Sequence, residues 1–249
     1  YKIYEPFIRM AAGFGEASIK HDKERYEHKY EYCDLLITGS GPSGLASAYA
    51  AAKNGARVIL AEDKPRFGGS LLTSDVNIGN QTGVEWTEKI IAELKSMPNV
   101  TVKNRSQVFG YYDHNMLVMS ERISDHLPKT QKYLPKQRLW YIRANEVLIS
   151  SGSIERPLVF GNNDTPGVML SSAAKEYMKV YGVLVGKKPL IFTNNDSGYE
   201  TAIEFKKNGV NPIILDTRSN PSSDIITEAK NLNIEIRFSY VVVAAKGYK

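Results

Sequence analysis

A glycine-rich turn between an apolar strand and an alanine-rich helix limits the fold of this chain most strongly. Residues 39–44 read GSGPSG, the pattern G-x-G-x-x-G, and follow the apolar run 34–38 directly. Such a run is typical of a strand buried on both faces of a parallel sheet. A helix is predicted over 45–53 and a second strand over 57–61. The sequence therefore predicts one βαβ unit of a Rossmann-type α/β fold.

The three glycines of the turn fit the binding of a dinucleotide. Gly39 permits the tight turn, Gly41 lets the backbone approach a pyrophosphate, and Gly44 lets helix and strand pack closely. The phosphates would face free N–H groups at a helix N-terminus, where the helix dipole favours negative charge. We expect this unit to hold the ADP half of FAD or NAD.

Glu62 ends the second strand, where an acidic residue is expected to bond the ribose 2′-hydroxyl. Together with Asp63 it would repel a 2′-phosphate, and this disfavours NADP. Lys64 and Arg66 follow closely and count in the other direction. NAD or FAD is therefore the expected ligand.

The pair Gly68-Gly69 is similar to the diglycine of two-domain flavoproteins, where the backbone again passes close to the cofactor. A disulfide reductase of this build needs a redox cysteine pair soon after it, and residues 70–74 contain none. The sequence excludes that class. Cys33, the single cysteine, also rules out an intrachain disulfide and agrees with a reducing compartment.

A second Rossmann-like unit is predicted near the carboxyl end. Residues 189–193 and 211–216 are expected to be strands, 198–208 a helix, and 240–244 a further strand. The turn 194–198 reads NNDSG and lacks the first two fingerprint glycines, so we expect it not to hold a pyrophosphate closely. The unit also has fewer strands than expected, and we expect either a fragment of a longer protein or a chain completed by something else.

We predict three parts: a linker or arm (1–31), a dinucleotide-binding domain (32–160), and a truncated second Rossmann-like domain (161–249). The charge of +5 is spread along the chain, which argues against nucleic-acid binding. No apolar stretch approaches the ~20 residues of a membrane-spanning helix, and the first twenty residues lack a signal-peptide core. We expect a cytoplasmic protein.

The sequence assigns neither a catalytic residue nor a metal site. The histidines at 21, 28, 114 and 126 lack the close pairing of a zinc site, and none can be tied to a serine nucleophile. The polar, aromatic run 111–115 is compatible with a site, but a turn between two strands is favoured.

Several unusual runs together resemble the alpha subunit of heterotetrameric sarcosine oxidase over essentially the whole chain. They span residues 5–34, the fingerprint with Pro42, and residues 67–72, 109–115, 138–140, 154–157 and 163–170. The resemblance implies a multisubunit flavoprotein that oxidatively demethylates sarcosine to glycine. The one-carbon unit leaves as formaldehyde or methylene-tetrahydrofolate, and oxygen is reduced to hydrogen peroxide.

The resemblance also implies cofactors and partners. FAD belongs to the beta subunit, covalent FMN to the alpha–beta interface, and NAD without an established redox role to the alpha subunit; gamma and delta subunits complete the complex. NAD is then the expected ligand of this chain. The contacts carried over are Gly39, Gly41, Ser43 and Gly44 for the pyrophosphate, Glu62, Asp63 and Lys64 for the adenosine ribose, and Gly69, Ser70 and Val108 nearby.

Two alternatives stay open. The chain could instead be a self-sufficient flavin enzyme, with FAD in the first unit and a nicotinamide cofactor in the second. The chain could also be part of the alpha subunit of a related proline, opine or other secondary-amine enzyme, because those subunits share these sequence motifs. Because the remaining NAD contacts and the folate-binding domain of the family lie outside this sequence, we expect the segment alone not to oxidise sarcosine.

Overall fold

The first unit is built on a six-stranded mixed sheet. The computed structural model describes residues 4–13, 19–128 and 133–247. The sheet has the order β5-β2-β1-β8-β7-β6, in which the first four strands are parallel and β7 and β6 antiparallel. Its strands are β1 (Tyr26–Thr38), β2 (Val58–Ala61), β5 (Val100–Lys103), β6 (Ser106–Tyr112), β7 (Met116–Arg122) and β8 (Gln137–Ile149).

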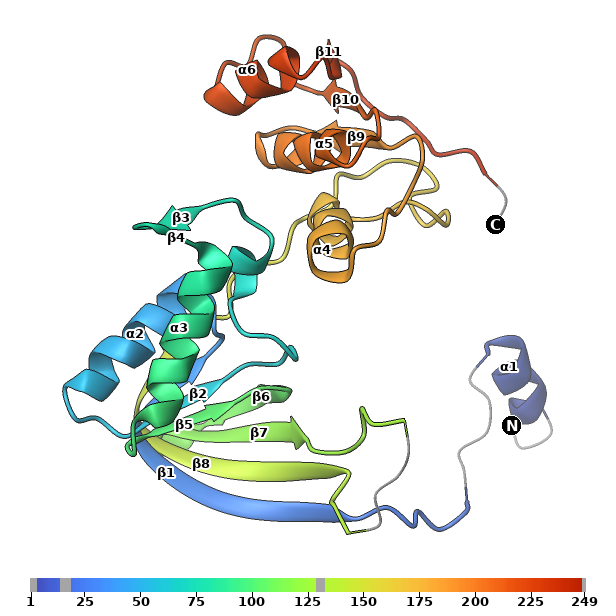
Figure 1. The fold of residues 1–249 in the computed structure, drawn as a ribbon. Coiled ribbons are helices and arrows are strands. Elements are labelled where there is room, and N and C mark those ends of the chain that lie inside the picture. Colours follow the sequence, from blue (N-terminus) through green and yellow to red (C-terminus); the bar gives the residue numbers. More distant parts are fainter. Residues whose placement is uncertain (1–3, 14–18, 129–132, 248–249) are drawn as a thin grey trace.

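Two helices, α2 (Pro42–Lys53) and α3 (Gly83–Ser96), cover one face of this sheet (Figure 1). Side chains alternate between the two faces along each strand. Ile37 and Leu60 therefore face the helices and pack in one cluster with Leu45 of α2. This layer holds the start of α2, and with it the glycine-rich turn, against the carboxyl end of β1.

On the opposite face, side chains from the strands form a second core cluster. Leu36 and Ile59 cluster there with Met119 of β7 and Trp140 of β8. At the start of β6, the backbone N–H of Ser106 donates to the carbonyl of Glu62, just beyond β2, at 2.7 Å. The far edge of the sheet thus returns to the end of β2.

The second unit has a smaller parallel sheet in the order β11-β10-β9. Its core contains Tyr199 and Ile214, both fully buried, and α4 packs against α5. Its elements are α4 (Ser171–Tyr181), β9 (Leu190–Thr193), α5 (Ser197–Lys207), β10 (Ile213–Asp216), α6 (Asp224–Asn231) and β11 (Glu235–Phe238). The short elements of the chain are α1 (Glu5–Ala11), η1 (Gly69–Leu72), β3 (Asn77–Ile78), β4 (Gln81–Thr82) and η2 (Asp113–Asn115).

The predicted α/β, Rossmann-like fold class is confirmed, with differences at the element ends. The first strand begins at Tyr26, inside the predicted arm, because β1 pairs with β8 from this residue onward. Residues 1–3 and 14–18 of that arm lie outside the described residues. The division at residues 31 and 160 stays a prediction. Within the described ranges, no helix is long and apolar enough to cross a membrane.

The predicted strand at 240–244 is wrong. The last strand of the second unit is β11, and Ser239 after it has a left-handed backbone with φ of 61°. After this turn the N–H of Tyr240 still donates to the carbonyl of Asp216 at 3.2 Å, but residues 241–244 form no strand, and Ala244 makes an isolated bridge with Gly161. In contrast, the turn predicted within 111–115 is present at Asp113–Asn115, where η2 joins β6 to β7, while Tyr111 and Tyr112 end β6.

Candidate functional site

The glycine-rich turn lies at the carboxyl end of β1 and leads directly into α2. Gly39 has φ of 98°, and a Cβ atom there would lie 2.4 Å from the carbonyl oxygen of Ser150. A Cβ atom on Gly44 would lie 2.0 Å from the carbonyl oxygen of Gly39. Both positions therefore require glycine for the turn and for helix packing, as the fingerprint predicts.

At Gly41, by contrast, the protein itself does not require glycine. Its φ of −66° suits any residue, and a Cβ atom on it would meet no protein atom within 4 Å. It caps α2, whose first N–H groups, including those of Ser43 and Gly44, have no acceptor within the helix. Open space, free donors and a helix dipole coincide here, so the turn fits a pyrophosphate.

Glu62 is buried beside this turn, with 6% of its surface exposed. Its Oε2 accepts hydrogen bonds from the N–H and the hydroxyl of Ser40, at 2.9 and 2.5 Å. Its Oε1 accepts from the N–H of Lys64 at 3.0 Å. Burial raises the pKa of Glu62, helped by Asp63 and opposed by these hydrogen bonds. Of about four lone-pair sites on a carboxylate, about one remains for a ribose hydroxyl.

The diglycine crosses directly against the fingerprint turn. Gly68 and Gly69 have φ of 121° and 53°, and a Cβ atom on Gly69 would lie 2.9 Å from the Cα of Gly41. The N–H of Gly68 donates to the carbonyl of Ser40 at 3.1 Å. The two glycine segments therefore lie against each other, and the approach of the diglycine to a cofactor stays a prediction.

The remaining residues on the ribose side differ in their placement. Val108 is half-buried on β6, two residues after the one that bonds the Glu62 carbonyl. Asp63 is exposed, and its carbonyl accepts from the guanidinium of Arg122 at 2.9 Å. The ammonium of Lys64 donates to both carboxylate oxygens of Glu176, at 2.7 and 2.9 Å. The structure thus directs Lys64 toward α4.

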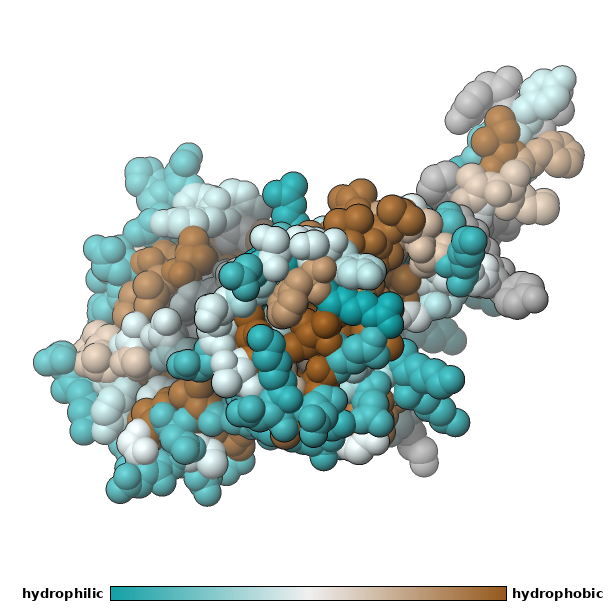
Figure 2. All heavy atoms as spheres, turned by 90° about the horizontal axis from the view of Figure 1, so that it is seen from above, coloured by the Kyte–Doolittle hydropathy of each residue, from teal (hydrophilic) through white to brown (hydrophobic). Residues whose placement is uncertain are grey.

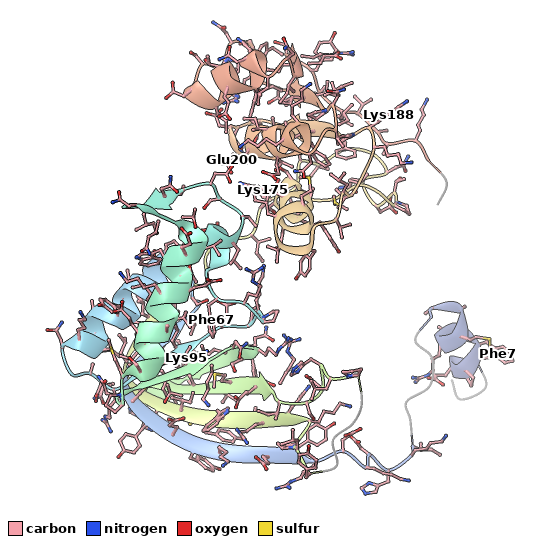
Figure 3. All side chains as sticks on the ribbon, in the orientation of Figure 1. Phe7, Phe67, Lys95, Lys175, Lys188 and Glu200 are labelled. Carbon is pink, nitrogen blue, oxygen red and sulfur yellow. The ribbon has the colours of Figure 1, made fainter. Side chains whose placement is uncertain are left out.

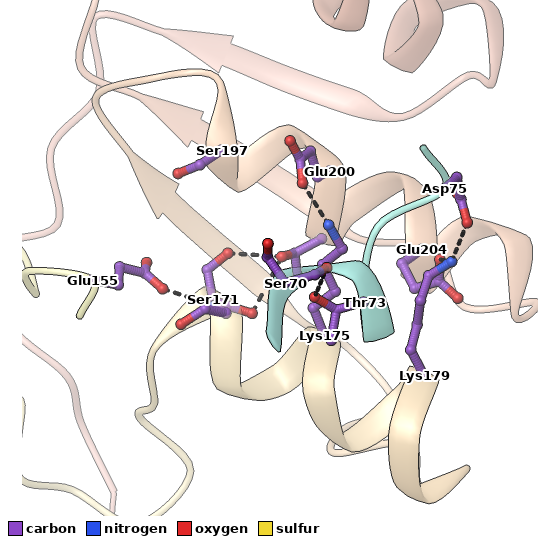
Figure 4. A network of polar contacts seen from close by, with 12 residues as sticks. Ser70, Thr73, Asp75, Glu155, Ser171, Lys175, Lys179, Ser197, Glu200 and Glu204 are labelled. Carbon is purple, nitrogen blue, oxygen red and sulfur yellow. Dashed lines mark hydrogen bonds and ion pairs between the residues drawn. The ribbon is translucent and has the colours of Figure 1, made fainter. Parts of the chain in front are cut away.

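Ser70 is exposed and lines a cavity of about 940 Å³ between the two units. Lys175 of α4 and Glu200 of α5 point toward each other on its wall (Figure 3), at 2.5 Å. Glu155 accepts from the backbone N–H of Ser172 at 2.7 Å and so bonds the first turn of α4 (Figure 4). The lining also includes Arg156 and the apolar residues Leu158 and Phe192, so polar and apolar groups share the wall.

The turn of the second unit differs from that of the first. Gly198 stands at the position of the third fingerprint glycine. Glycine is required there because a Cβ atom would lie 2.8 Å from the Cβ of Thr193. Asn195, however, carries a side chain whose Oδ1 accepts from the N–H of Ser197 at 2.9 Å. It therefore uses a donor at the start of α5 that a phosphate would need.

Asp216 ends β10, as Glu62 follows β2, but it is fully buried and bonded within the protein. Its carboxylate accepts from the hydroxyl of Tyr199 at 2.7 Å and from the guanidinium of Arg218 at 2.8 Å. These contacts favour a structural role for Asp216.

A second cavity, of about 890 Å³, lies beside β9. Phe160, Met169 and Leu190 are among the residues that line it. Figure 2, which looks down on the second unit, shows apolar surface among hydrophilic side chains. Within the described ranges, no group of three His, Cys, Asp or Glu residues is placed to hold a metal ion.

Two residues of the site were not identified from the sequence. Ser40 occupies a variable position of the fingerprint, and its hydroxyl contact with Glu62 depends on how β1 and β2 pair. Glu176 lies 112 residues from its partner Lys64, and no motif marks it.

Residues 34–125 match the model of a family described as FAD dependent oxidoreductase. The sarcosine oxidase alpha subunit of Rhizobium meliloti (strain 1021) is 45% identical over 218 residues, which are 87% of this chain and 22% of that protein. The sarcosine oxidase alpha subunit of Corynebacterium sp. (strain P-1) is 35% identical over 94% of this chain and 24% of that protein. The chain thus spans about a fifth to a quarter of these relatives' length.

Solved structures show the same fold. L-proline dehydrogenase from P. horikoshii has a TM-score of 0.63 at 20% identity, over 84% of this chain and 40% of that one. Thioredoxin reductase from T. acidophilum has a TM-score of 0.60 at 17% identity, over 87% and 67% of the two chains. These likenesses place the chain among Rossmann-like flavoprotein folds, and the relatives above confirm the resemblance that the sequence motifs indicated.

Proposed function

We propose that this chain, a homologue of sarcosine oxidase alpha subunits over most of its length, forms the NAD-binding portion of such a protein. The whole complex would demethylate sarcosine to glycine, with formaldehyde or methylene-tetrahydrofolate and hydrogen peroxide as further products. FAD and FMN would be held elsewhere in the complex, which would include beta, gamma and delta subunits. The single cysteine fits the reducing cytoplasm in which we expect it to work.

The geometry of Gly41 is the observation that carries the nucleotide proposal. A side chain at this position would fit the protein, yet the sequence has glycine and leaves open space above the first turn of α2. A pyrophosphate would accept from the N–H groups of Ser43 and Gly44, and the carboxylate of Glu62 would accept from a ribose hydroxyl. These residues bind and orient; none of them is proposed to react.

NAD is favoured over two other dinucleotides. The fingerprint holds the ADP half that NAD and FAD share, so the choice of NAD follows from the homology to alpha subunits. NADP is disfavoured because its 2′-phosphate would lie beside the buried carboxylate of Glu62. When bound, NAD would add its binding free energy to the stability of the fold by mass action.

A self-sufficient FAD-dependent oxidoreductase is the second candidate. The match of residues 34–125 to the FAD dependent oxidoreductase model favours it. The second unit counts against it, because Asn195 fills the start of α5 and Asp216 is bonded within the protein. Another candidate, closer to the proposed function, is the corresponding component of a related amine enzyme. An opine oxidase component of Agrobacterium tumefaciens (strain Ach5) is 26% identical over 65% of this chain and 33% of that protein.

The test is to purify the chain, record its visible spectrum, and identify the nucleotide released on acid denaturation. Released NAD without flavin absorption supports the proposal. Stoichiometric FAD contradicts it and favours the flavin enzyme. If the protein is purified empty, NAD is added during thermal unfolding, and a melting temperature that does not rise with NAD concentration also contradicts the proposal.

A further inference from the structure

Lys64 links the ribose side of the site to the second unit. Its backbone N–H donates to Oε1 of Glu62 at 3.0 Å, so the residue begins directly beside the acid that would bind a ribose hydroxyl. Its ammonium bonds both carboxylate oxygens of Glu176 on α4, at 2.7 and 2.9 Å. Side-chain exposures of 49% for Lys64 and 31% for Glu176 leave the pair accessible to ligand and solvent.

The position of Lys64 matters for nucleotide choice. In Rossmann units, an acid at the end of the second strand bonds the ribose 2′-hydroxyl, whereas a cation nearby accommodates the 2′-phosphate of NADP. Here both an acid and a cation are present within three residues, and the acid is buried. Whether the cation is available therefore decides how strongly a 2′-phosphate is rejected.

We propose that Glu176 is a specificity-determining residue, which keeps the site selective for dinucleotides with a free 2′-hydroxyl by holding the ammonium of Lys64 on α4. The inference rests on the proposed function, because it assumes that the first unit binds a dinucleotide. It adds a residue of the second unit to the recognition of the adenosine end.

The other charged residues of α4 support the pairing of Glu176 with Lys64. Lys175 is paired with Glu200, and Lys179 is paired with both Asp75 and Glu204 (Figure 4). These two lysines already have carboxylate partners from other elements, which leaves Glu176 for Lys64. Asp63 lies next to Lys64 and also favours its charged form, but its carboxylate is exposed to solvent.

The test compares dissociation constants of the full chain for NAD and NADP, by calorimetric titration at low salt. In Glu176→Gln the ammonium of Lys64 is released, and NADP should gain about fivefold in affinity relative to NAD, the equivalent of about 1 kcal/mol for one charge contact. The gain should fall as salt is added, since the contact is exposed. The double variant Lys64→Met/Glu176→Gln should lose it.

Two further variants separate this role from general charge effects. Glu176→Asp keeps a carboxylate and should stay close to the original selectivity. If Glu176→Gln unfolds, Glu176→Ala takes its place as the test, because it also removes the carboxylate that holds Lys64 and should give the same gain for NADP. Glu204→Gln removes a different carboxylate facing α4, and it should not change the NADP-to-NAD ratio.

An unchanged ratio in Glu176→Gln with normal NAD binding would overturn the inference and leave the proposed function intact. An equal gain in Glu204→Gln would overturn it too, because any lost acidic charge would then suffice. If the original chain binds no NAD under any condition, the proposed function itself is contradicted.

Discussion

Ser40 and Glu62, separated by 22 residues, are joined by two hydrogen bonds to one carboxylate oxygen: the Ser40 N–H donates at 2.9 Å and its hydroxyl at 2.5 Å. Both residues are buried. The contact ties the fingerprint turn to the end of β2, and the N–H of Gly68 extends it to the diglycine through the Ser40 carbonyl at 3.1 Å. Three segments of the candidate site thus meet at one serine.

Replacement of Glu62 by glutamine should destabilise the protein by about 1–3 kcal/mol. Each carboxylate oxygen accepts from a backbone N–H, that of Ser40 or of Lys64. The amide group of Gln must therefore turn a donor toward a donor in either orientation. Urea unfolding measures the change, with Glu88→Gln on the exposed side of α3 as control. Equal midpoints and slopes for both variants would contradict this account.

Gly41→Ala and Gly44→Ala should act in opposite ways. A methyl group on Gly41 meets no protein atom, so the melting temperature without ligand should stay within about 2 °C. The same methyl would occupy the space of the pyrophosphate and weaken NAD binding about tenfold or more, as expected for overpacking of about 1–3 kcal/mol. Gly44→Ala should instead destabilise the fold itself, because its Cβ would lie 2.0 Å from the Gly39 carbonyl oxygen. Normal NAD affinity in a folded Gly41→Ala variant would argue against a pyrophosphate at the turn.

The ion pair of Asp34 and Arg57 predicts a pH-dependent effect. Hydrogen bonds from the Arg57 side chain and backbone lower the pKa of Asp34 from 3.8 to about 2. A carboxyl with a lowered pKa stabilises the fold above its ordinary pKa, and the contribution disappears as the pH falls through about 2. Asp34→Asn should therefore melt below the original protein at pH 7, and the two curves should converge toward pH 2. A difference that persists at pH 2 would mean that the charge of Asp34 is not its source.

Tyr199→Phe should lower the free energy of unfolding by about 1–3 kcal/mol without affecting nucleotide binding. The hydroxyl of Tyr199 is buried and donates to the fully buried carboxylate of Asp216 at 2.7 Å. Its removal leaves Asp216 with fewer donors, inside the second unit and away from the fingerprint. Chemical denaturation gives the change, and Tyr181→Phe, 59% exposed on α4, is the control. A loss of NAD affinity in Tyr199→Phe would show that the second unit contributes to the site.

The local pattern of residues 34–62 was sufficient to predict β1, α2 and β2, but not the other strands of the first unit. Glycine at positions 39, 41 and 44 serves turn, ligand approach and packing, and these needs arise within a few residues of each other. The early start of β1 was missed because its pairing with β8 joins residues more than 100 positions apart. The strand predicted at 240–244 failed because Ser239 turns the chain before a valine-rich run that local propensity alone favours.

The sequence alone predicted the Rossmann-type unit and its acidic residue, because these depend on spacing within residues 34–62, and it indicated the family through runs spread over residues 5–170. Tertiary structure decided which groups are free to act. It showed that the Glu62 carboxylate is largely occupied, that Asn195 closes the second turn, and that Glu176 holds Lys64. The Asn195 contact is local, between residues two positions apart, whereas the contacts of Glu62 with Ser40 and of Glu176 with Lys64 span 22 and 112 residues and arise only when sheet and helices pack together.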